Sequence, residues 1–255
     1  MEQQVSFRNQ SGEKLTGTLH LPDMATGCGV VFGHCFTCTR HTGVLREICS
    51  RLTAENFMAL RFDFSGNGQS EGRFADSTYS KQISEMKTAA DFIADKGADW
   101  VGLSGHSLGA SIAVLTASQT GSIKAVCALS GRLSGLNARH FLSQTQRREL
   151  QETGRMFFSS RGRSLELTNG FFADAGQYSL PEAVAALKTP FLVIHGDRDE
   201  IIPVKEAYHA KKLNPKGATL AVIPDADHMF SLPEHRRQVA ELAVKWFKEH
   251  AMARA

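Results

Sequence analysis

The chain has 255 residues, of which 42% are hydrophobic and 22% charged, and its formal net charge is +3. This length and composition allow a sizeable buried core and exclude disordered, collagen-like and disulfide-scaffold proteins. The small net charge gives no reason to expect nucleic-acid binding. The polar N-terminus lacks the apolar core of a signal peptide, and no apolar stretch reaches the ~18 residues of a membrane span. We therefore expect a cytoplasmic protein without membrane contact.

Apolar runs alternate with helical patterns along most of the chain, after an antiparallel hairpin formed by Gln4–Phe7 and Lys14–Leu21. Because most later strands are followed by a helix, we expect an α/β fold with a mostly parallel, doubly wound sheet and helices on both faces. These strands are expected at 28–32, 57–62, 101–103, 123–129, 190–195 and 218–223, and the helices at 43–56, 80–95, 110–119, 204–212 and 233–249.

The alternation stops between strands 123–129 and 190–195, where arginines and aromatic residues are frequent. We expect one domain over 1–255, with an irregular lid or cap insertion at 131–182 above the carboxyl ends of the strands, where such sheets bind ligands. The arginines could attract anionic substrates. We prefer a solvated lid whose aromatic residues pack on the body, because Glu149 and Glu152 alternate with the arginines at helical spacing.

The segment Gly105-His-Ser107-Leu108-Gly109 stands between a predicted strand and a predicted helix. In this context the G-x-S-x-G pattern is typical of a nucleophile elbow. A serine at the apex of such a tight turn needs neighbours without a Cβ, which the two glycines supply. The N–H of Leu108 then lies at a helix N-terminus, where a negatively charged oxygen is stabilised.

A serine nucleophile needs a base within hydrogen-bond reach and an acid that orients the base. Asp197 and Asp199 follow strand 190–195, and His228 follows strand 218–223. Singly, either aspartate could cap a helix and His228 could be one of ten ordinary histidines. Together, the order Ser107, Asp199, His228 at successive strand ends predicts a catalytic triad, with Asp197 as the alternative acid.

Over nearly its whole length the chain resembles the α/β-hydrolases, in particular small serine esterases and serine aminopeptidase-like members. The resemblance implies an eight-stranded α/β-hydrolase sheet, a triad acid three residues before Ile202 and therefore at Asp199, and no cofactor or metal. Bacterial small-ester hydrolases, including modules fused to OsmC-like domains, are similar in the loop after Gly33 and in segment 169–175. The motifs of the wider resemblance are Gly33-His34, Asp63-x-x-Gly66-x-Gly68-x-Ser70, the elbow, Gly196-x-x-Asp199-x-x-Ile202-Pro203 and Asp227-His228-x-Phe230.

The resemblance also implies an oxyanion hole built from the Leu108 N–H and one N–H of the loop after strand 28–32. Families with His-Gly-Phe use the third residue, here Phe36, but Cys35 stands where glycine is usual, so both Cys35 and Phe36 stay candidates.

Cys35-x-x-Cys38, between His34 and His41, also allows a thiol redox pair or a metal site. Neither a thioredoxin-like context nor a second ligand pair accompanies it. We therefore interpret the segment as an oxyanion loop that contains cysteines. Because the chain has five cysteines, an odd number, and is expected to be cytoplasmic, we expect all five to be reduced thiols.

These patterns predict a serine hydrolase that cleaves carboxylic esters with small to medium, apolar or aromatic acyl groups through an acyl-enzyme. Its partner would be a small-molecule ester, and the protein itself a monomer or homodimer. A thioesterase, amidase or peptidase would use the same triad. A ligand-binding protein that has lost turnover, or a thiol-dependent redox protein using Cys35 and Cys38, are the alternatives of another class.

Overall fold

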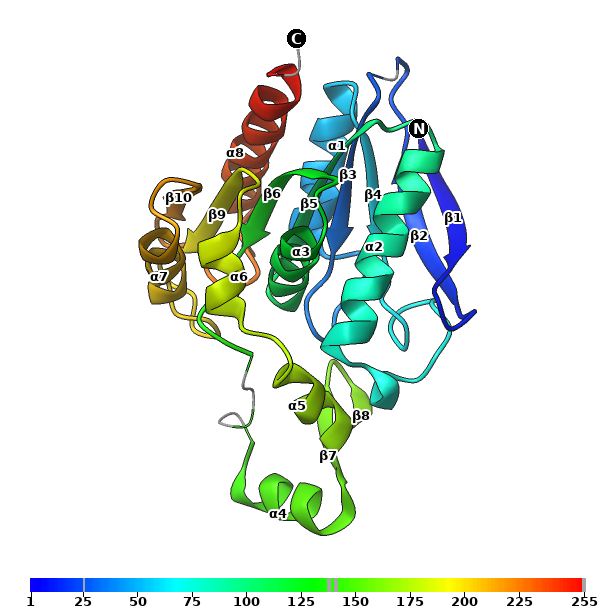
Figure 1. The fold of residues 1–255 in the computed structure, drawn as a ribbon, viewed down its shortest axis with the longest axis vertical. Helices are drawn as coiled ribbons and strands as arrows, with labels where there is room; N and C mark the ends of the chain where they lie inside the picture. The colour runs from blue at the N-terminus through cyan, green and yellow to red at the C-terminus, as the bar shows by residue number, and fades with distance from the viewer. Residues whose placement is uncertain (25, 137–138, 140–141, 254–255) are drawn as a thin grey trace.

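The computed structural model describes residues 1–24, 26–136, 139 and 142–253. In this part of the chain, eight strands form one mixed sheet in the order β1-β2-β4-β3-β5-β6-β9-β10 (Figure 1). The β1–β2 and β2–β4 pairs are antiparallel, and the other neighbours are parallel. The expected mostly parallel, doubly wound sheet of eight strands is confirmed.

Strands β3, β4, β5 and β9 carry no exposed residue and β6 exposes only Lys124, since helices cover both faces of the sheet. The opening hairpin, which the sequence predicts, lies at one edge of the sheet, and β10 forms the other edge. The strands of this sheet are β1 (Glu2–Arg8), β2 (Lys14–His20), β3 (Cys28–Gly33), β4 (Met58–Phe62), β5 (Trp100–His106), β6 (Ile123–Leu129), β9 (Phe191–Gly196) and β10 (Ala218–Ile223).

Two helical layers sandwich the sheet, and each encloses its own apolar core. One layer consists of α1 (Gly43–Ala54) and α8 (Pro233–Met252). The other consists of α2 (Tyr79–Asp95), α3 (Leu108–Gln119), α6 (Leu180–Ala186) and α7 (Lys205–Leu213), with the short helix η1 (Phe74–Asp76) before α2. The helix α3 is apolar nearly all round because it is buried between the sheet and its neighbours.

The insertion, residues 131–182, holds more regular structure than expected. It forms α4 (Gln144–Thr153), an antiparallel hairpin of β7 (Arg155–Ser160) and β8 (Arg163–Thr168), α5 (Asn169–Ala175) and the start of α6. The expectation of irregular structure was wrong, because strands of six residues and helices with one to four buried residues leave too short a pattern to read. Positions 137–138 and 140–141 of the insertion lie outside the described residues.

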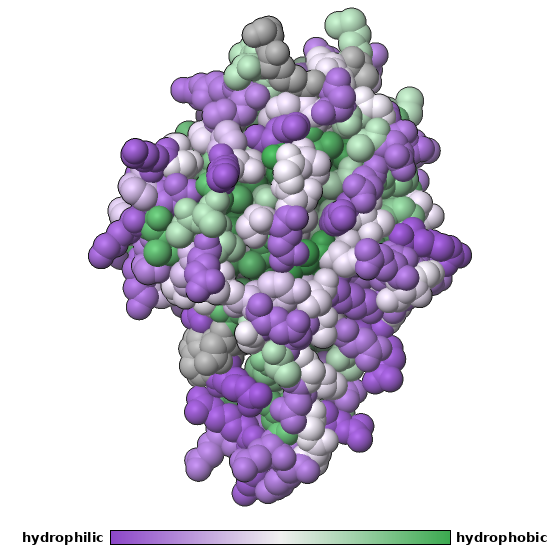
Figure 2. Space-filling model, viewed as in Figure 1, coloured by the Kyte–Doolittle hydropathy of each residue, from purple (hydrophilic) through white to green (hydrophobic). Residues whose placement is uncertain are grey.

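The projecting end of the insertion around α4 is largely hydrophilic on its surface (Figure 2; bottom of Figure 1). Arg148 lies 4.0 Å from Glu152 and Arg155 lies 3.9 Å from Glu166, so these arginines have acidic partners. Phe171 is buried against Tyr79 of α2, with ring centroids 5.2 Å apart. This arrangement fits a solvated outer face and aromatic residues that pack inward.

Candidate active site

Ser107 joins β5 to α3 in a strained turn. Its φ of +57° and ψ of −115° lie in a region that L-residues rarely occupy, at a cost of about 1–3 kcal/mol. A Cβ on Gly105 would lie 2.2 Å from the backbone of Gly109, and one on Gly109 would lie 2.3 Å from the carbonyl oxygen of Gly33. Only glycine therefore fits at either position, as the G-x-S-x-G pattern predicts.

Asp199 lies in the loop after β9, where its carboxylate is buried and receives hydrogen bonds from both sides. Oδ1 accepts from the N–H groups of Ile201 (2.9 Å) and Ile202 (2.7 Å). Oδ2 accepts from Nδ1 of His228 at 2.7 Å and lies 3.2 Å from Nε2 of His195. Burial opposes ionisation, but the bonds from His195, His228 and Ile202 outweigh it and hold the pKa of Asp199 well below its usual range.

Asp197, the alternative acid, is exposed, and its carboxylate accepts a hydrogen bond from the N–H of Asp225 at 2.7 Å. The structure therefore brings Asp199, and not Asp197, to His228.

His228 lies in the loop between β10 and α8, and its main chain is tied to the elbow. Nε2 of His106 donates to the carbonyl oxygen of His228 at 2.7 Å, and the two rings are 4.8 Å apart. Burial, followed by the charge of His228, lowers the pKa of His106 from 6.5 to about 3, so its ring is neutral. Because His106 precedes Ser107 directly, this bond fixes the distance between the two loops that carry Ser107 and His228.

His106 and His195 were missed by the sequence reasoning, although both stand inside recognised motifs. His106 is the variable residue of Gly105-His-Ser107, and His195 is the strand residue before Gly196. Both side chains are fully buried, and Nε2 of His195 also donates to the carbonyl oxygen of Ile202 at 2.8 Å. The sequence signal that could have identified them is a histidine at the carboxyl end of an apolar strand, where most neighbours are buried.

Ser107 faces a cavity rather than a hydrogen-bond partner. Among the described residues its hydroxyl has no hydrogen bond to His228. Such bonds are often long in enzymes without substrate and tighten when substrate binds.

The cavity has a volume of about 430 Å³, and its walls are mostly apolar. The Phe36 ring contacts three other phenylalanine rings, with centroids 5.2 Å from Phe74, 6.0 Å from Phe158 and 5.4 Å from Phe171. More than half of the lining residues belong to the insertion. The lining consists of Phe36, Tyr79, Ser107, Leu108, Ser111, Arg132, Leu136, Leu142, Gln146, Met156, Phe158, Leu167, Phe171, Phe172, Ile201 and Ile202.

In the loop after β3, Cys35 and Phe36 are the two candidates for the second oxyanion donor, and they differ in position. Phe36 and Leu108 line the cavity, whereas Cys35 does not. Within the described residues, neither the Phe36 N–H nor the Leu108 N–H donates to another protein group. Both amides are thus available to an oxygen bound above Ser107.

Cys35 and Cys38 form a disulfide, so the expectation that all five cysteines are reduced was wrong for this pair. The two cysteines are three residues apart in the sequence, but the sequence does not show that the loop between them turns so that both sulfurs meet. The other three cysteines, Cys28, Cys49 and Cys127, are buried and lie outside this disulfide. Burial raises the pKa of Cys127 to about 12 and raises that of Cys49 further, so these two thiols stay protonated.

No cluster of three or more His, Cys, Asp or Glu that could hold a metal ion occurs in the described part of the chain. The disulfide also removes both thiolates from the metal site that Cys35 and Cys38 could have formed with His34 and His41. None of the helices formed by the described residues is long and apolar enough to cross a membrane.

A strained serine at the end of a central parallel strand, with a histidine and an aspartate from later strand ends, defines a hydrolase of the α/β type. The chain belongs to the alpha/beta hydrolase family, whose model matches residues 30–242.

Several known proteins and solved structures are similar to this chain at low sequence identity. A monoacylglycerol lipase of Mycolicibacterium smegmatis is 23% identical over 276 residues, which cover 96% of each chain. A Mycobacterium tuberculosis protein provisionally named a phosphoribosyl transferase is 25% identical over 239 residues, covering 92% of this chain. The chain spans only 44% of that relative's length. The solved structure of Est1E from Butyrivibrio proteoclasticus with bound ferulic acid is 22% identical, with a TM-score of 0.83 over 97% of this chain and 99% of that one.

Proposed function

We propose that this alpha/beta hydrolase is a serine esterase whose triad is Ser107, His228 and Asp199. The observation that carries the proposal is the 2.7 Å bond from His228 to a buried carboxylate, beside a cavity lined by a strained serine. His228 takes the proton of Ser107 as the hydroxyl attacks the ester carbonyl, and Asp199 stabilises the charged imidazole. His228 gives this proton to the alcohol as it leaves. The neutral histidine then takes a proton from a water molecule that attacks the acyl-enzyme, and returns it to Ser107 as the acid is released.

The N–H groups of Leu108 and Phe36 form the oxyanion hole in this proposal. Leu108 is the first residue of α3, where the helix dipole also favours negative charge. Phe36 replaces Cys35 as the second donor because it lines the cavity and its N–H has no protein acceptor among the described residues. Each such donor contributes roughly 3–4 kcal/mol to stabilisation of the transition state.

The acyl group that fits is small to medium, and apolar or aromatic. The cavity volume lies at the lower end of the range for small-molecule sites, about 300–1,000 Å³. The contacts between Phe36, Phe158 and Phe171 give it an aromatic wall that can hold a flat ring. The likeness to a structure with bound ferulic acid, an aromatic acid, supports this choice. The insertion, which supplies most of the wall, acts as the lid.

The test combines a fluorophosphonate probe with p-nitrophenyl esters of short, medium and aromatic acids, beside a Ser107→Ala control. We expect labelling at Ser107, turnover of the esters and loss of both in the control. Faster turnover of matched thioesters or amides than of the esters would favour the thioesterase or amidase alternative. A folded protein that is neither labelled nor active would instead be a ligand-binding protein on this scaffold.

A further inference from the structure

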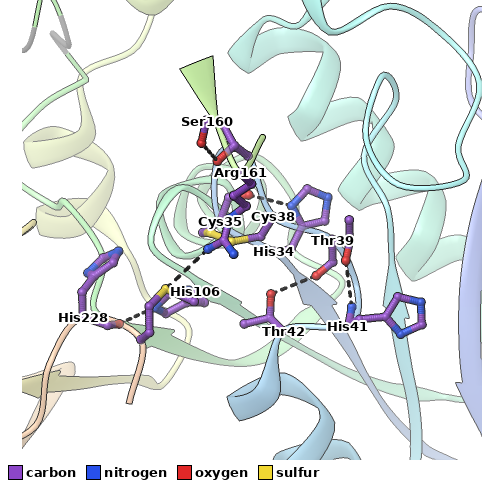
Figure 3. The surroundings of a disulfide bond; sticks show 12 residues. His34, Cys35, Cys38, Thr39, His41, Thr42, His106, Ser160, Arg161 and His228 are labelled. Atoms are coloured by element: carbon purple, nitrogen blue, oxygen red, sulfur yellow. Dashed lines mark hydrogen bonds between the residues drawn. A yellow bond between two sulfur atoms is a disulfide. The ribbon is translucent and has the colours of Figure 1, made fainter. Parts of the chain in front are cut away.

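The loop between β3 and α1 carries a covalent link at the point where the second oxyanion donor is held. The disulfide joins Cys35, which is 8% exposed, to Cys38, which is 4% exposed. Figure 3 shows it beside His34, with the hydrogen-bonded pair His106 and His228 below it and to the left in this view. The covalent link is therefore buried next to the candidate active site, although neither cysteine lines the cavity.

The carbonyl group of Cys35 is fixed by two donors. The N–H of Cys38 donates to it at 3.0 Å, and Nδ1 of His34 donates to it at 2.7 Å (Figure 3). Nε2 of His34 accepts from the N–H of Phe64 at 3.1 Å, so the ring proton of the neutral imidazole is on Nδ1. Burial lowers the pKa of His34, which keeps the ring neutral.

A fixed carbonyl also fixes the amide that shares its peptide plane. In a trans peptide the C=O and N–H point in opposite directions, and no cis peptide bond occurs in the described residues. The Cys35 oxygen points to His34 and Cys38, so the Phe36 N–H points away from these two groups. Phe36 itself lines the cavity together with Ser107. The disulfide closes the same turn as the Cys38 bond and restrains this plane.

The turn also supports the insertion. Thr37 stands between the two cysteines, and its hydroxyl lies 2.8 Å from the hydroxyl of Ser160 in β7. Its carbonyl oxygen accepts from Nη2 of Arg163 in β8 at 3.3 Å. A change in the turn thus reaches both the oxyanion donor and the hairpin over the cavity.

We infer that the Cys35–Cys38 disulfide is a positioning element of the oxyanion hole, and that it makes ester hydrolysis sensitive to dithiol reductants. The inference rests on the proposed esterase function. A dithiol supplies two electrons and two protons, which convert the S–S bond to two thiols, and the dithiol leaves as its cyclic disulfide. In the reduced protein the turn is closed by hydrogen bonds alone, and the Phe36 N–H is held less firmly.

The experiment compares oxidised and dithiothreitol-reduced protein, with thiols counted by alkylation and mass spectrometry. We expect two fewer thiols in the oxidised form. On reduction kcat should fall about tenfold, with little change in KM. This fall is smaller than the loss of about 10²–10³-fold in kcat when a whole oxyanion donor is removed, because the Phe36 N–H is still present. Reoxidation should restore kcat. A shift in KM alone would show a binding role and would overturn the inference.

The variant Cys38→Ser tests whether the effect belongs to this bond. This variant removes the disulfide but leaves residues 35 and 36 unchanged. Its kcat should therefore equal that of the reduced protein and should not respond to dithiothreitol. Cys127→Ser, which changes a buried cysteine outside the disulfide, should respond as the unaltered protein does.

Other outcomes count against the inference. Equal kcat in the two redox forms, a higher kcat after reduction, or five free thiols after treatment with an oxidant would overturn it. Any of these would leave labelling at Ser107 intact, whereas failure of the esterase proposal would abolish labelling in both forms.

Discussion

Replacement of Asp199 by asparagine removes the charge that orients His228 and preserves the shape of the side chain. The orientation of the new amide follows from the structure. Oδ1 receives two backbone N–H groups, from Ile201 and Ile202, so the amide oxygen has to stay at that position. The NH₂ group then occupies the place of Oδ2, facing Nδ1 of His228 and Nε2 of His195.

This orientation forces His228 into the wrong tautomer. An NH₂ group can only donate, so Nδ1 of His228 has to accept and the ring proton moves to Nε2. That nitrogen is the one that takes the proton of Ser107 in the proposed mechanism. Loss of the correct tautomer in a serine protease triad lowers kcat about 10⁴-fold, which corresponds to about 5 kcal/mol, and we expect a loss of this size here.

The assay measures kcat for a p-nitrophenyl ester, with urea unfolding as a check that the variant is folded. Asp197→Asn is the matched control, because Asp197 is exposed and bonded to a backbone N–H of the neighbouring loop. We expect the control to keep activity within about threefold, as for an ordinary surface substitution. A large loss in Asp197→Asn with near-normal activity in Asp199→Asn would refute the choice of acid, and near-normal activity in both would refute the triad.

Three further changes test the elbow, the buried histidine and the cavity wall. Gly109→Ala should lower the free energy of unfolding by roughly 1–3 kcal/mol, since its Cβ meets the backbone of Gly33, whereas Gly121→Ala has open space and should be neutral in the same urea titration. His106 binds a proton more weakly when folded (pKa about 3) than when unfolded (6.5), so stability is lost as pH falls through 6.5. Between about pH 7.5 and about pH 5 that loss is about 2 kcal/mol, and urea titrations of His106→Gln should lack it. Phe171→Ala should cost about 3–5 kcal/mol of stability and raise KM for aromatic esters, whereas Phe157→Ala, at a half-exposed site, should change the free energy of unfolding by less than about 0.5 kcal/mol.

The sheet and the positions of the candidate triad residues could be predicted because both depend on patterns that extend over many residues. Each central strand is an apolar run bounded by a loop, and parallel strands bring their carboxyl ends to one edge. Asp199 and His228 are 29 residues apart in the chain, and this rule brings the two loops that carry them to the same edge. The choice of Asp199 over Asp197 came from the family pattern and not from strand order.

The remaining features depend on side-chain direction, which no periodicity records. His106 could have pointed into either layer of the core, and its bond to the carbonyl oxygen of His228 joins residues 122 positions apart. The disulfide depends on the bend of a loop that has no repeating pattern. In the insertion, α4 has Leu150 as the one buried residue among its ten, so its sequence shows no row of apolar residues that would predict a packed helix.

The place of the insertion in the sheet has a consequence for how such a protein diversifies. The strands on either side of it, β6 and β9, are direct parallel neighbours, with Val126 opposite Phe191 and Leu129 opposite Ile194. The ladder between them needs nothing from the insertion, and the residues proposed to break bonds all lie outside it. More than half of the cavity lining is thus encoded apart from the residues proposed to cleave the substrate. If the insertion were exchanged between relatives, the cavity wall would change while the proposed catalytic residues stayed the same. The new insertion would also have to supply a hydroxyl group in the place of Ser160, the partner of Thr37.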